Sequence, residues 1–510
     1  MLGLHPVRGL RLAMARDLTL GTYLERLAEV RGDHVLATDV ATGRVWTHRS
    51  AAERVEHLAG CFARRVPAGE RVVLATPNGV DQLLLVLAAS RAGLVPAPVN
   101  ALMTPNEVEH VVDDCQAQLV VRTVAELEAD ADAAVDTGAA RAASVPVDRS
   151  AVAALFYTSG TTGRPKGVEL SHRGLLGSIA AGALWPAGVR RDECVVALPV
   201  AHIMGFVVLL ALAGGGIPAY VLPRFEPTQV LDAIETRRST GFVGVPAMYR
   251  RLLDAGAEQR DLTSVRLWAS GADAMPAELA ARFKAMGATV TLPFVGRAVG
   301  EAIFAEGYGM VEAAGAVALK VSPPMVRAGL GSSIGLPVPG NEFRVVDEEG
   351  DVVATGATGE LQVQGPGVLS GYWGATETEV GALTADGWLR TGDLVVKGPL
   401  GTFSFVGRSK DVLMHGGYSV YALEVEQALE QHPEVVQAAV VGLDDEAMGE
   451  VPAAAVRLLP DSSLTGAELA RWARERLSDY KAPRQVVVVD DLPHGGTGKV
   501  QKDRVRALFG

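Results

Sequence analysis

The chain has 510 residues, which is enough for more than one folding unit with its own buried core. Hydrophobic residues make up 48% of it and charged residues 21%, the balance of an ordinary globular protein, and the formal net charge of -12 argues against nucleic acid as a partner. Three cysteines (Cys61, Cys115 and Cys194) lie far apart, so they predict neither a disulfide framework nor a metal-binding cluster, and we expect a cytoplasmic location.

Before residue 150 the sequence alternates between helix-like and strand-like patterns. The spacing of apolar residues predicts helices over 18–30, 50–65 and 80–92 and buried strands over 71–75 and 94–99. Thr104, followed by Pro105 and Glu107, is typical of the beginning of a further helix. Strands that alternate with helices in this way predict α/β units with a largely parallel sheet.

A stretch rich in glycine and hydroxyl groups follows a predicted strand over residues 151–156. It reads Tyr-Thr-Ser-Gly-Thr-Thr-Gly-Arg-Pro-Lys-Gly over residues 157–167. The glycines allow backbone amides to turn inward, the hydroxyls add donors and Lys166 adds a mobile positive charge, so the stretch suits the phosphates of a nucleotide. A solvated turn is the alternative. A P-loop NTPase is disfavoured, because Lys166 is followed by Gly167 rather than by Ser or Thr.

This stretch carries a family resemblance. Residues 157–168 match the pattern Y-T-S-G-T-T-G-x-P-K-G-V throughout, and the chain thus resembles the adenylate-forming enzymes, which include acyl-CoA synthetases, adenylation domains of peptide synthetases and firefly-type luciferases. The resemblance implies that the phosphates of ATP are bound by Thr158, Ser159, Gly160, Thr161, Thr162, Gly163 and Lys166.

The segment Leu-Pro-Val-Ala-His over residues 198–202 is similar to the next family motif, which places His202 beside the substrate carboxylate; a packed structural histidine is the alternative. No Asp or Glu occurs from His202 to Leu222, so an amino acid with a charged ammonium group is disfavoured and a plain carboxylic acid with an apolar body is favoured. Glycines and Pro218 divide the apolar stretch 206–222 into a helix and a strand, so we expect no membrane span. An apolar acid pocket is expected from Phe206, Val207, Phe242, Val243 and Val245.

Two further motifs resemble the adenine and metal sites of the family. In Ser-Gly-Ala, Gly271 and Ala272 are implied to lie against the adenine. In the segment Gly-Tyr-Gly-Met-Val-Glu, Tyr308 and Gly309 are implied to bind the adenine, and Glu312 is implied to hold Mg²⁺, which prefers oxygen ligands. Val311 departs from the family, which usually has a threonine there, and a catalytically impaired paralogue is therefore an open alternative.

The remaining motifs extend the resemblance to the C-terminal part of the chain. By resemblance, Asp393 accepts both ribose hydroxyls and Arg408 reaches ribose or phosphate. Lys410 falls at the family's pivot, Gly416 and Gly417 face the channel of the CoA thiol, and Lys499 is the adenylation lysine that stabilises charge in the transition state. Helix 422–430 and strand 435–441 are predicted after the pivot.

The implied fold is α/β, with a large N-terminal domain of α/β sheet subdomains over residues 1–408 and a small mobile α+β C-terminal domain over residues 409–510. The implied reaction joins a carboxylic acid to AMP at the expense of ATP and Mg²⁺, and then transfers the acyl group to CoA. Transfer to an acyl-carrier protein and an oxygen-dependent luciferase reaction are alternatives. The chain is expected to be a monomer or a homodimer.

Overall fold

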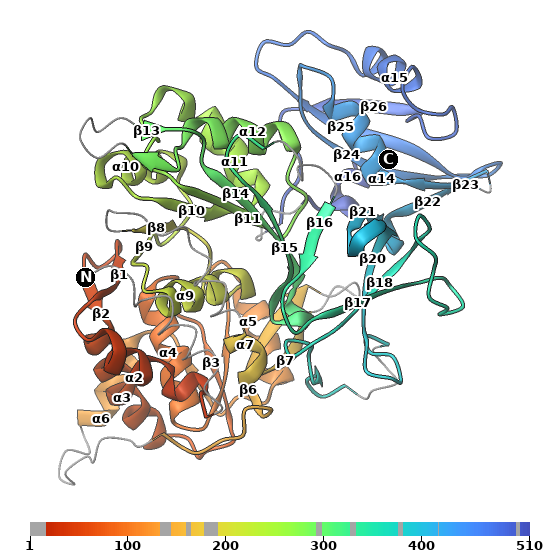
Figure 1. Ribbon diagram of the computed structural model, residues 1–510. Coiled ribbons are helices and arrows are strands. Elements are labelled where there is room, and N and C mark those ends of the chain that lie inside the picture. The colour runs from red at the N-terminus through yellow and green to blue at the C-terminus, as the bar shows by residue number, and fades with distance from the viewer. Residues whose placement is uncertain are drawn as a thin grey trace. The chain divides into compact units, whose positions relative to one another are not determined.

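The computed structural model describes residues 17–132, 144–159, 165–177, 192–291, 298–326, 333–375, 381–416, 418–495 and 500–510 (Figure 1). The chain divides into two compact units. The larger unit comprises Met1–Gly331, Gly335–Glu342 and Val363–Leu389, and the smaller comprises Ser332–Ile334, Phe343–Gln362 and Arg390–Gly510. The predicted α/β fold with a smaller C-terminal part is thereby confirmed, whereas the boundary at residue 408 and the pivot at Lys410 stay predictions.

The N-terminal region of the larger unit is built as predicted from alternating helices and strands. Helices α2 (Leu20–Arg31), α3 (His48–Ala63) and α4 (Val80–Arg91) pack on one another. The parallel strands are β3 (Arg71–Leu74), β4 (Val95–Pro98) and β5 (Leu119–Val121), with β3 in the middle. Two helices complete the region, α5 (Pro105–Asp114) and α6 (Val124–Asp132).

Helix α5 begins where the sequence predicts it. The hydroxyl of Thr104 accepts a hydrogen bond from the backbone N–H of Glu107 at 3.3 Å, and the Glu107 carboxylate accepts one from the backbone N–H of Thr104 at 2.7 Å. This capping box satisfies two backbone donors that a helix start would otherwise leave unpaired.

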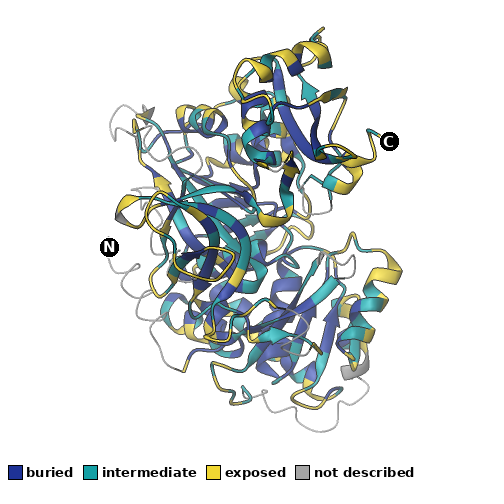
Figure 2. Ribbon diagram, turned by 90° about the vertical axis from the view of Figure 1, so that its right-hand side faces the viewer, coloured by how far each residue is buried: buried dark blue, intermediate teal, exposed yellow. Residues whose placement is uncertain are grey.

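A second, larger sheet forms the centre of this unit. Its strands begin in the order β2 (Val45–Thr47), β1 (Val35–Asp39), β9 (Ala219–Val221), β8 (Cys194–Val196), β10 (Gly241–Gly244), β11 (Leu267–Gly271), β14 (Ile303–Met310) and β15 (Gly315–Ser322), and β16 (Ser333–Pro337) pairs with β15. Pairing is parallel from β1 to β14 and antiparallel between β14 and β15. The central parallel strands β8 and β10 are fully buried, as in sheets whose connections cross by helices (Figure 2). In such sheets ligands bind beyond the carboxyl ends of the strands, where β11 ends at Gly271.

Helices α10 (Pro227–Arg237), α11 (Pro246–Asp254) and α12 (Ala277–Met286) pack on one face of this sheet around an aromatic core. The rings of Tyr249 and Phe283 lie 4.8 Å apart, and those of Trp268 and Phe283 lie 5.0 Å apart. Phe242 is fully buried in the same cluster, with its ring 5.5 Å from that of Tyr249. The prediction that Phe242 lines an acid pocket is therefore wrong, because its side chain packs within the hydrophobic core.

The apolar stretch 206–222 forms most of helix α9 (Ile203–Gly215) and all of β9, as predicted. Gly216 caps the carboxyl end of helix α9, and its φ of +71° is left-handed and suits glycine. Within the described residues, no helix is both long enough and apolar enough to cross a membrane.

A separate antiparallel hairpin carries the glycine-rich stretch. Strand β6 (Val152–Ser159) pairs with β7 (Pro165–Ser171), which in turn pairs with β19 (Gly371–Tyr372). The short helix α7 (His172–Leu176) follows β7 directly. The predicted strand before the stretch is confirmed, and the structure adds a second strand after it.

The described residues of the smaller unit form two groups of strands and three α-helices. One group lies in the order β17 (Glu342–Val346), β18 (Thr358–Gln364), β20 (Leu389–Lys397) and β21 (Phe403–Arg408). The other lies in the order β23 (Tyr418–Tyr421), β22 (Val412–His415), β25 (Gly449–Leu458) and β24 (Val435–Asp445), with β26 (Gln485–Val489) on β25. The helices are α14 (Ala422–Glu430), α15 (Gly466–Arg474) and α16 (Lys502–Arg506), and the first of them confirms the predicted helix 422–430.

Candidate active site

The predicted phosphate loop joins the two strands of the β6–β7 hairpin. Thr158 and Lys166 are cross-strand partners in the antiparallel register, so their side chains lie on the same face of the hairpin. Gly160, Thr161, Thr162 and Gly163 lie outside the described residues, and the side chain of Ser159 is likewise outside them. The hairpin thus brings one hydroxyl and one cation of the predicted set together at the base of the loop.

Tyr372, for which the sequence analysis predicts no role, lies between this lysine and the predicted metal carboxylate. Its hydroxyl donates a hydrogen bond to Oε1 of Glu312 at 3.0 Å, and the Nζ atom of Lys166 lies 5.9 Å from the centre of its ring. Burial, and then the neighbouring Glu312 carboxylate, raise the pKa of Tyr372, so the phenol keeps its proton and acts as a donor. The sequence signal was its place in Ser370-Gly-Tyr-Trp373, a stretch that follows family order.

Glu312 lies in a 3₁₀ turn (Val311–Ala313) directly after β14. The backbone N–H of Leu369 donates to its carbonyl oxygen at 2.8 Å, so both backbone and side chain are anchored by the segment that leads to β19. Among the described residues no group of three His, Cys, Asp or Glu side chains could hold a metal. A single carboxylate still fits Mg²⁺, because this ion commonly takes one or two protein carboxylates together with substrate phosphate oxygens and water.

The predicted adenine wall lies at the carboxyl end of β11 and along β14. A Cβ atom on Gly271 would lie 3.1 Å from the carbonyl oxygen of Gly307 and 3.3 Å from Cε of Met204. A Cβ on Gly309 would lie 1.9 Å from the carbonyl oxygen of Gly315, so only glycine fits there. Tyr308 lies between the two close approaches, on the same strand. The glycines therefore keep the backbones of β11, β14 and β15 close together beside Tyr308.

Ala272 has a φ of +68°, in the left-handed region that residues with a Cβ atom rarely adopt. It directly follows β11, at the edge where the adenine is expected. Backbone strain of this kind concentrates at binding sites, where the surrounding structure enforces it. The strain at Ala272 therefore agrees with a functional turn.

His202 caps the amino end of helix α9. Its Nδ1 atom accepts a hydrogen bond from the backbone N–H of Met204 at 3.3 Å. Accepting at Nδ1 selects the neutral tautomer with its proton on Nε2, the nitrogen that can donate to a carboxylate. The same helix start places Met204 against Gly271, so His202 and the predicted adenine wall belong to neighbouring segments.

A buried polar row that the sequence did not reveal crosses the sheet one residue before the glycines. Ser270, Glu306 and Lys320 are register partners on β11, β14 and β15. The Lys320 ammonium lies 2.8 Å from Oε1 of Glu306, while burial raises the pKa of Glu306 and Lys320 opposes that rise. The Ser270 hydroxyl is buried and has no partner within the part of the chain that the structure describes. The ion pair fixes the strand segment that continues into Tyr308.

In the smaller unit, Asp393 and Arg408 are register partners on β20 and β21. The Nε–H of Arg408 donates to Oδ1 of Asp393 at 2.8 Å, and the Asp393 side chain is only 3% exposed. Lys410 is exposed in the 3₁₀ turn Ser409–Asp411, and Gly416 has a left-handed φ of +58°. Gly417 and Lys499 lie outside the described residues. Strand pairing thus assembles the predicted ribose pair, while the roles of these residues stay predictions.

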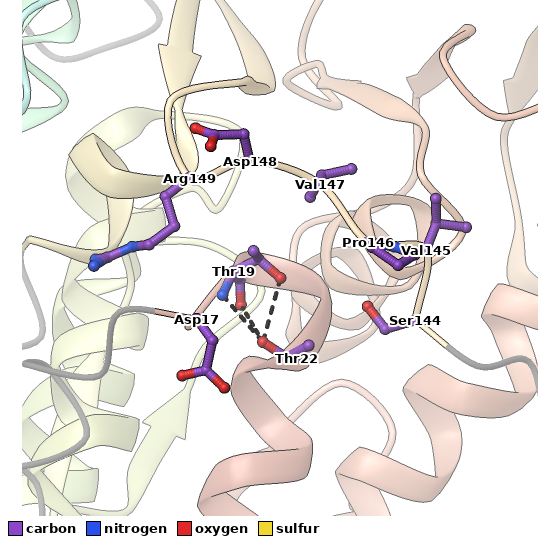
Figure 3. Close-up of a pocket in the computed structure, with 9 residues that line it drawn as sticks. All are labelled: Asp17, Thr19, Thr22, Ser144, Val145, Pro146, Val147, Asp148 and Arg149. Atoms are coloured by element: carbon purple, nitrogen blue, oxygen red, sulfur yellow. Dashed lines mark hydrogen bonds between the residues drawn. The ribbon is translucent and has the colours of Figure 1, made fainter.

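One cavity of about 330 Å³ lies elsewhere, between the start of α2 and the segment 144–149 (Figure 3). Figure 3 shows Thr19 and Thr22 linked by hydrogen bonds on one side of it, with the segment that carries Asp148 and Arg149 on the other. The residues that line it include none of the predicted site residues. It is therefore separate from the predicted nucleotide site.

The comparisons with known proteins agree with this geometry. Residues 24–373 match the family model of the AMP-binding enzyme, and residues 424–499 match that of the AMP-binding enzyme C-terminal domain. The two domain models together define an adenylate-forming enzyme. The chain belongs to the AMP-binding enzyme family, and within it to the acid–thiol ligases of the acyl-CoA synthetase type.

Individual relatives support the same assignment. The chain is 36% identical to a feruloyl-CoA synthase from Amycolatopsis sp, over 97% of this chain and 100% of that protein. It is 31% identical to the human mitochondrial malonate–CoA ligase ACSF3, over 88% of this chain and 85% of that protein. The crystal structure of ATP-bound MatB from Rhodopseudomonas palustris is similar, with a TM-score of 0.82 and 30% identity over 96% of this chain and 99% of that one.

Proposed function

We propose that this enzyme activates an apolar monocarboxylic acid as its acyl-adenylate and then transfers the acyl group to CoA. The observation that carries the proposal is the cluster of Lys166, Tyr372 and Glu312 at the base of the glycine-rich hairpin loop. It combines a cation, a fixed phenol donor and a carboxylate beside a loop whose composition suits phosphates. That combination is suited to an ATP triphosphate, whose charge must be offset while a nucleophile attacks.

In the first step the substrate carboxylate attacks the α-phosphorus of ATP, and pyrophosphate leaves. His202 donates from Nε2 to the carboxylate and orients it, and Asp393 accepts the ribose hydroxyls. Lys166 binds the phosphates, and Lys499 offsets the charge that grows on the α-phosphate. Glu312 would hold Mg²⁺, whose charge offsets that of the phosphate oxygens.

In the second step a thiolate attacks the acyl carbonyl of the adenylate, AMP leaves, and the thiol proton goes to solvent. We propose that a small mobile C-terminal domain pivots about Lys410 between the two steps, so that Lys499 withdraws and the segment with Gly416 and Gly417 faces the thiol. A cytoplasmic location, where CoA is available, stays our expectation.

The preference for an apolar monocarboxylic acid is supported by helix α9. From His202 to Leu222 the sequence has no charged residue other than the histidine itself, and the helix is apolar on all sides. A second carboxylate in the substrate would need a cation, which this segment does not supply. The relatives that act on feruloyl and malonate groups differ in this respect, so the acid must be measured directly.

The test is a panel of acids assayed for AMP release with and without CoA. The panel should hold a cinnamic-type aryl acid, a medium-chain fatty acid and malonate, and a second series should replace CoA by a holo acyl-carrier protein. We expect AMP release with the aryl or fatty acid and CoA, and little with malonate. Transfer only to the carrier protein would favour the acyl-AMP ligase alternative. Nucleotide binding without acid-dependent ATP–pyrophosphate exchange would favour the impaired paralogue, for which Val311 is the support.

A further inference from the structure

The part of strand β20 that carries Asp393 contains a left-handed glycine and is held by contacts on both sides. Gly392 has a φ of +68°, and its carbonyl oxygen accepts a hydrogen bond from the Ser409 hydroxyl at 3.2 Å. The backbone N–H of Asp393 donates to the Thr391 hydroxyl at 3.1 Å, and that hydroxyl donates to the carbonyl oxygen of Leu361 at 2.6 Å. This part of β20 is thus attached to the neighbouring strand β18.

Glu360 supplies the charged contact in this arrangement. Its Oε1 atom accepts a hydrogen bond from the backbone N–H of Gly392 at 3.1 Å, and its Oε2 atom lies 3.8 Å from Nη1 of Arg390. The Glu360 side chain is 22% exposed, whereas that of Arg390 is 52% exposed. A carboxylate that accepts from a backbone amide in a partly buried place makes a stronger hydrogen bond than a neutral acceptor does.

The hydrogen bond from Gly392 to Glu360 lies directly beside Asp393 in the sequence, so it affects the backbone that orients the Asp393 side chain. Gly392 immediately precedes Asp393, and a glycine in the left-handed region has more backbone freedom than any other residue. The N–H of Gly392 belongs to the Thr391–Gly392 peptide, so Glu360 fixes the backbone on the amino side of this glycine. The hydroxyls of Ser409 and Thr391 hold the next peptide, which joins Gly392 to Asp393. The Nε–H of Arg408 donates to Oδ1 of the Asp393 side chain. The direction of the carboxylate therefore depends on the backbone as well as on Arg408.

We propose that Glu360 is a positioning residue that orients Asp393 toward the ribose of ATP through the N–H of Gly392. The inference rests on the proposed function, because it takes Asp393 as the acceptor of the ribose hydroxyls. To accept hydrogen bonds from both ribose hydroxyls, the Asp393 carboxylate must be placed to within a fraction of an ångström. Loss of the Glu360 contact then weakens recognition of the hydroxyls rather than recognition of the phosphates or the adenine.

The experiment compares binding of ATP and 3′-deoxyATP to the full-length enzyme by calorimetry, so it needs no knowledge of the acid. The wild-type enzyme is expected to bind ATP about tenfold more tightly than 3′-deoxyATP, the scale of one hydrogen bond to a charged group. Glu360→Ala should weaken ATP binding and leave 3′-deoxyATP binding nearly unchanged. The ratio of the affinities for ATP and 3′-deoxyATP should therefore fall toward one. Glu360→Gln should keep the preference, because its amide oxygen accepts from the same N–H.

Arg390→Ala is the matched control, since it removes the ion pair and leaves the hydrogen bond to Gly392 intact; it should keep the preference. Glu360→Asp, which is too short to reach the amide but keeps the charge, replaces Glu360→Ala if the latter does not fold, and it should lower the preference as well. Thermal unfolding of each variant is measured in parallel. A lower melting temperature with an unchanged preference would assign Glu360 a structural role only and overturn the proposal.

Asp393→Asn separates this inference from the proposed function. If the wild-type enzyme shows no preference for ATP over 3′-deoxyATP, the ribose role of Asp393 is wrong and the inference falls with it. If the wild-type preference is lost in Asp393→Asn but kept in Glu360→Ala, only the role of Glu360 is wrong. If the preference for ATP is lost in both Asp393→Asn and Glu360→Ala but kept in Glu360→Gln, the positioning role of Glu360 is supported.

Discussion

The Tyr372 hydroxyl donates to the Glu312 carboxylate at 3.0 Å, and this hydrogen bond joins two segments that are far apart in the sequence. On strand β19, Tyr372 is the register partner of Val168 on β7. Strand β7 also carries Lys166. One phenol thus contacts the predicted metal carboxylate while its ring lies near the phosphate-loop lysine. The arrangement fixes Glu312 without neutralising it, because the donor is uncharged.

Replacing Tyr372 with Phe removes this donor and keeps the ring beside Lys166. We expect acid-dependent ATP–pyrophosphate exchange to fall about tenfold, the scale of one hydrogen bond to a charged group, and the Mg²⁺ concentration for half-maximal rate to rise. The measurement is the exchange rate over a Mg²⁺ titration. Tyr220→Phe, which alters a tyrosine under Arg237, is the control and should change neither quantity. Unchanged Mg²⁺ dependence in Tyr372→Phe would contradict the role.

Ala272 supplies a prediction about strain. A side chain with a Cβ costs about 1 kcal/mol in the left-handed region, and a β-branched side chain costs more. Ala272→Gly should therefore leave the melting temperature nearly unchanged, because relief of strain offsets the extra freedom of the unfolded chain. Ala272→Val should lower it by several degrees and raise the KM for ATP. Equal melting temperatures for the two variants would show that the turn carries no strain.

Lys499 lies outside the described residues, and its proposed role is tested by separating the two half-reactions. Lys499→Ala should reduce formation of the acyl-adenylate at least a hundredfold, as expected when a donor to developing charge is removed. The same variant should convert a preformed acyl-adenylate and CoA to thioester at close to the wild-type rate. Single-turnover measurements of each step decide the question, and equal losses in both would refute the assignment.

His48 predicts a dependence of stability on pH. Burial, and then the charges of Arg31 and His34, lower the pKa of His48 to about 3 from its ordinary value of 6.5. The imidazole is fully buried, and neither ring nitrogen has a partner among the residues that the structure describes. Below pH 6.5 His48 is protonated in the unfolded chain but stays neutral in the folded chain. The free energy of unfolding therefore falls as the pH falls from 6.5 toward 3.

The variant His48→Leu removes this proton uptake while keeping a similar volume. Between pH 6 and pH 4 the stability of the larger unit should therefore fall less steeply in the variant, by about 1.4 kcal/mol per pH unit at most. Urea unfolding followed by tryptophan fluorescence over this pH range measures the slope. Identical slopes for the variant and the wild-type enzyme would show that His48 does not contribute.

The sequence by itself determined the local elements and the family. Helix 422–430 and the helix start at Thr104 were predicted correctly, because apolar spacing and capping residues act over a few neighbours. The glycine-rich stretch also predicted a phosphate-binding loop, since its residues are contiguous. None of these features needs information about distant parts of the chain.

Only the tertiary structure decided which side chains face one another. It assigned Phe242 to the aromatic core rather than to an acid pocket, and it brought Tyr372 to Glu312 and Glu360 to Gly392. These outcomes depend on strand register and on helix packing, because a shift of one residue turns a side chain to the opposite face of a sheet. A sequence pattern fixes the period of a strand, whereas the partner opposite each residue is fixed only when the sheets assemble.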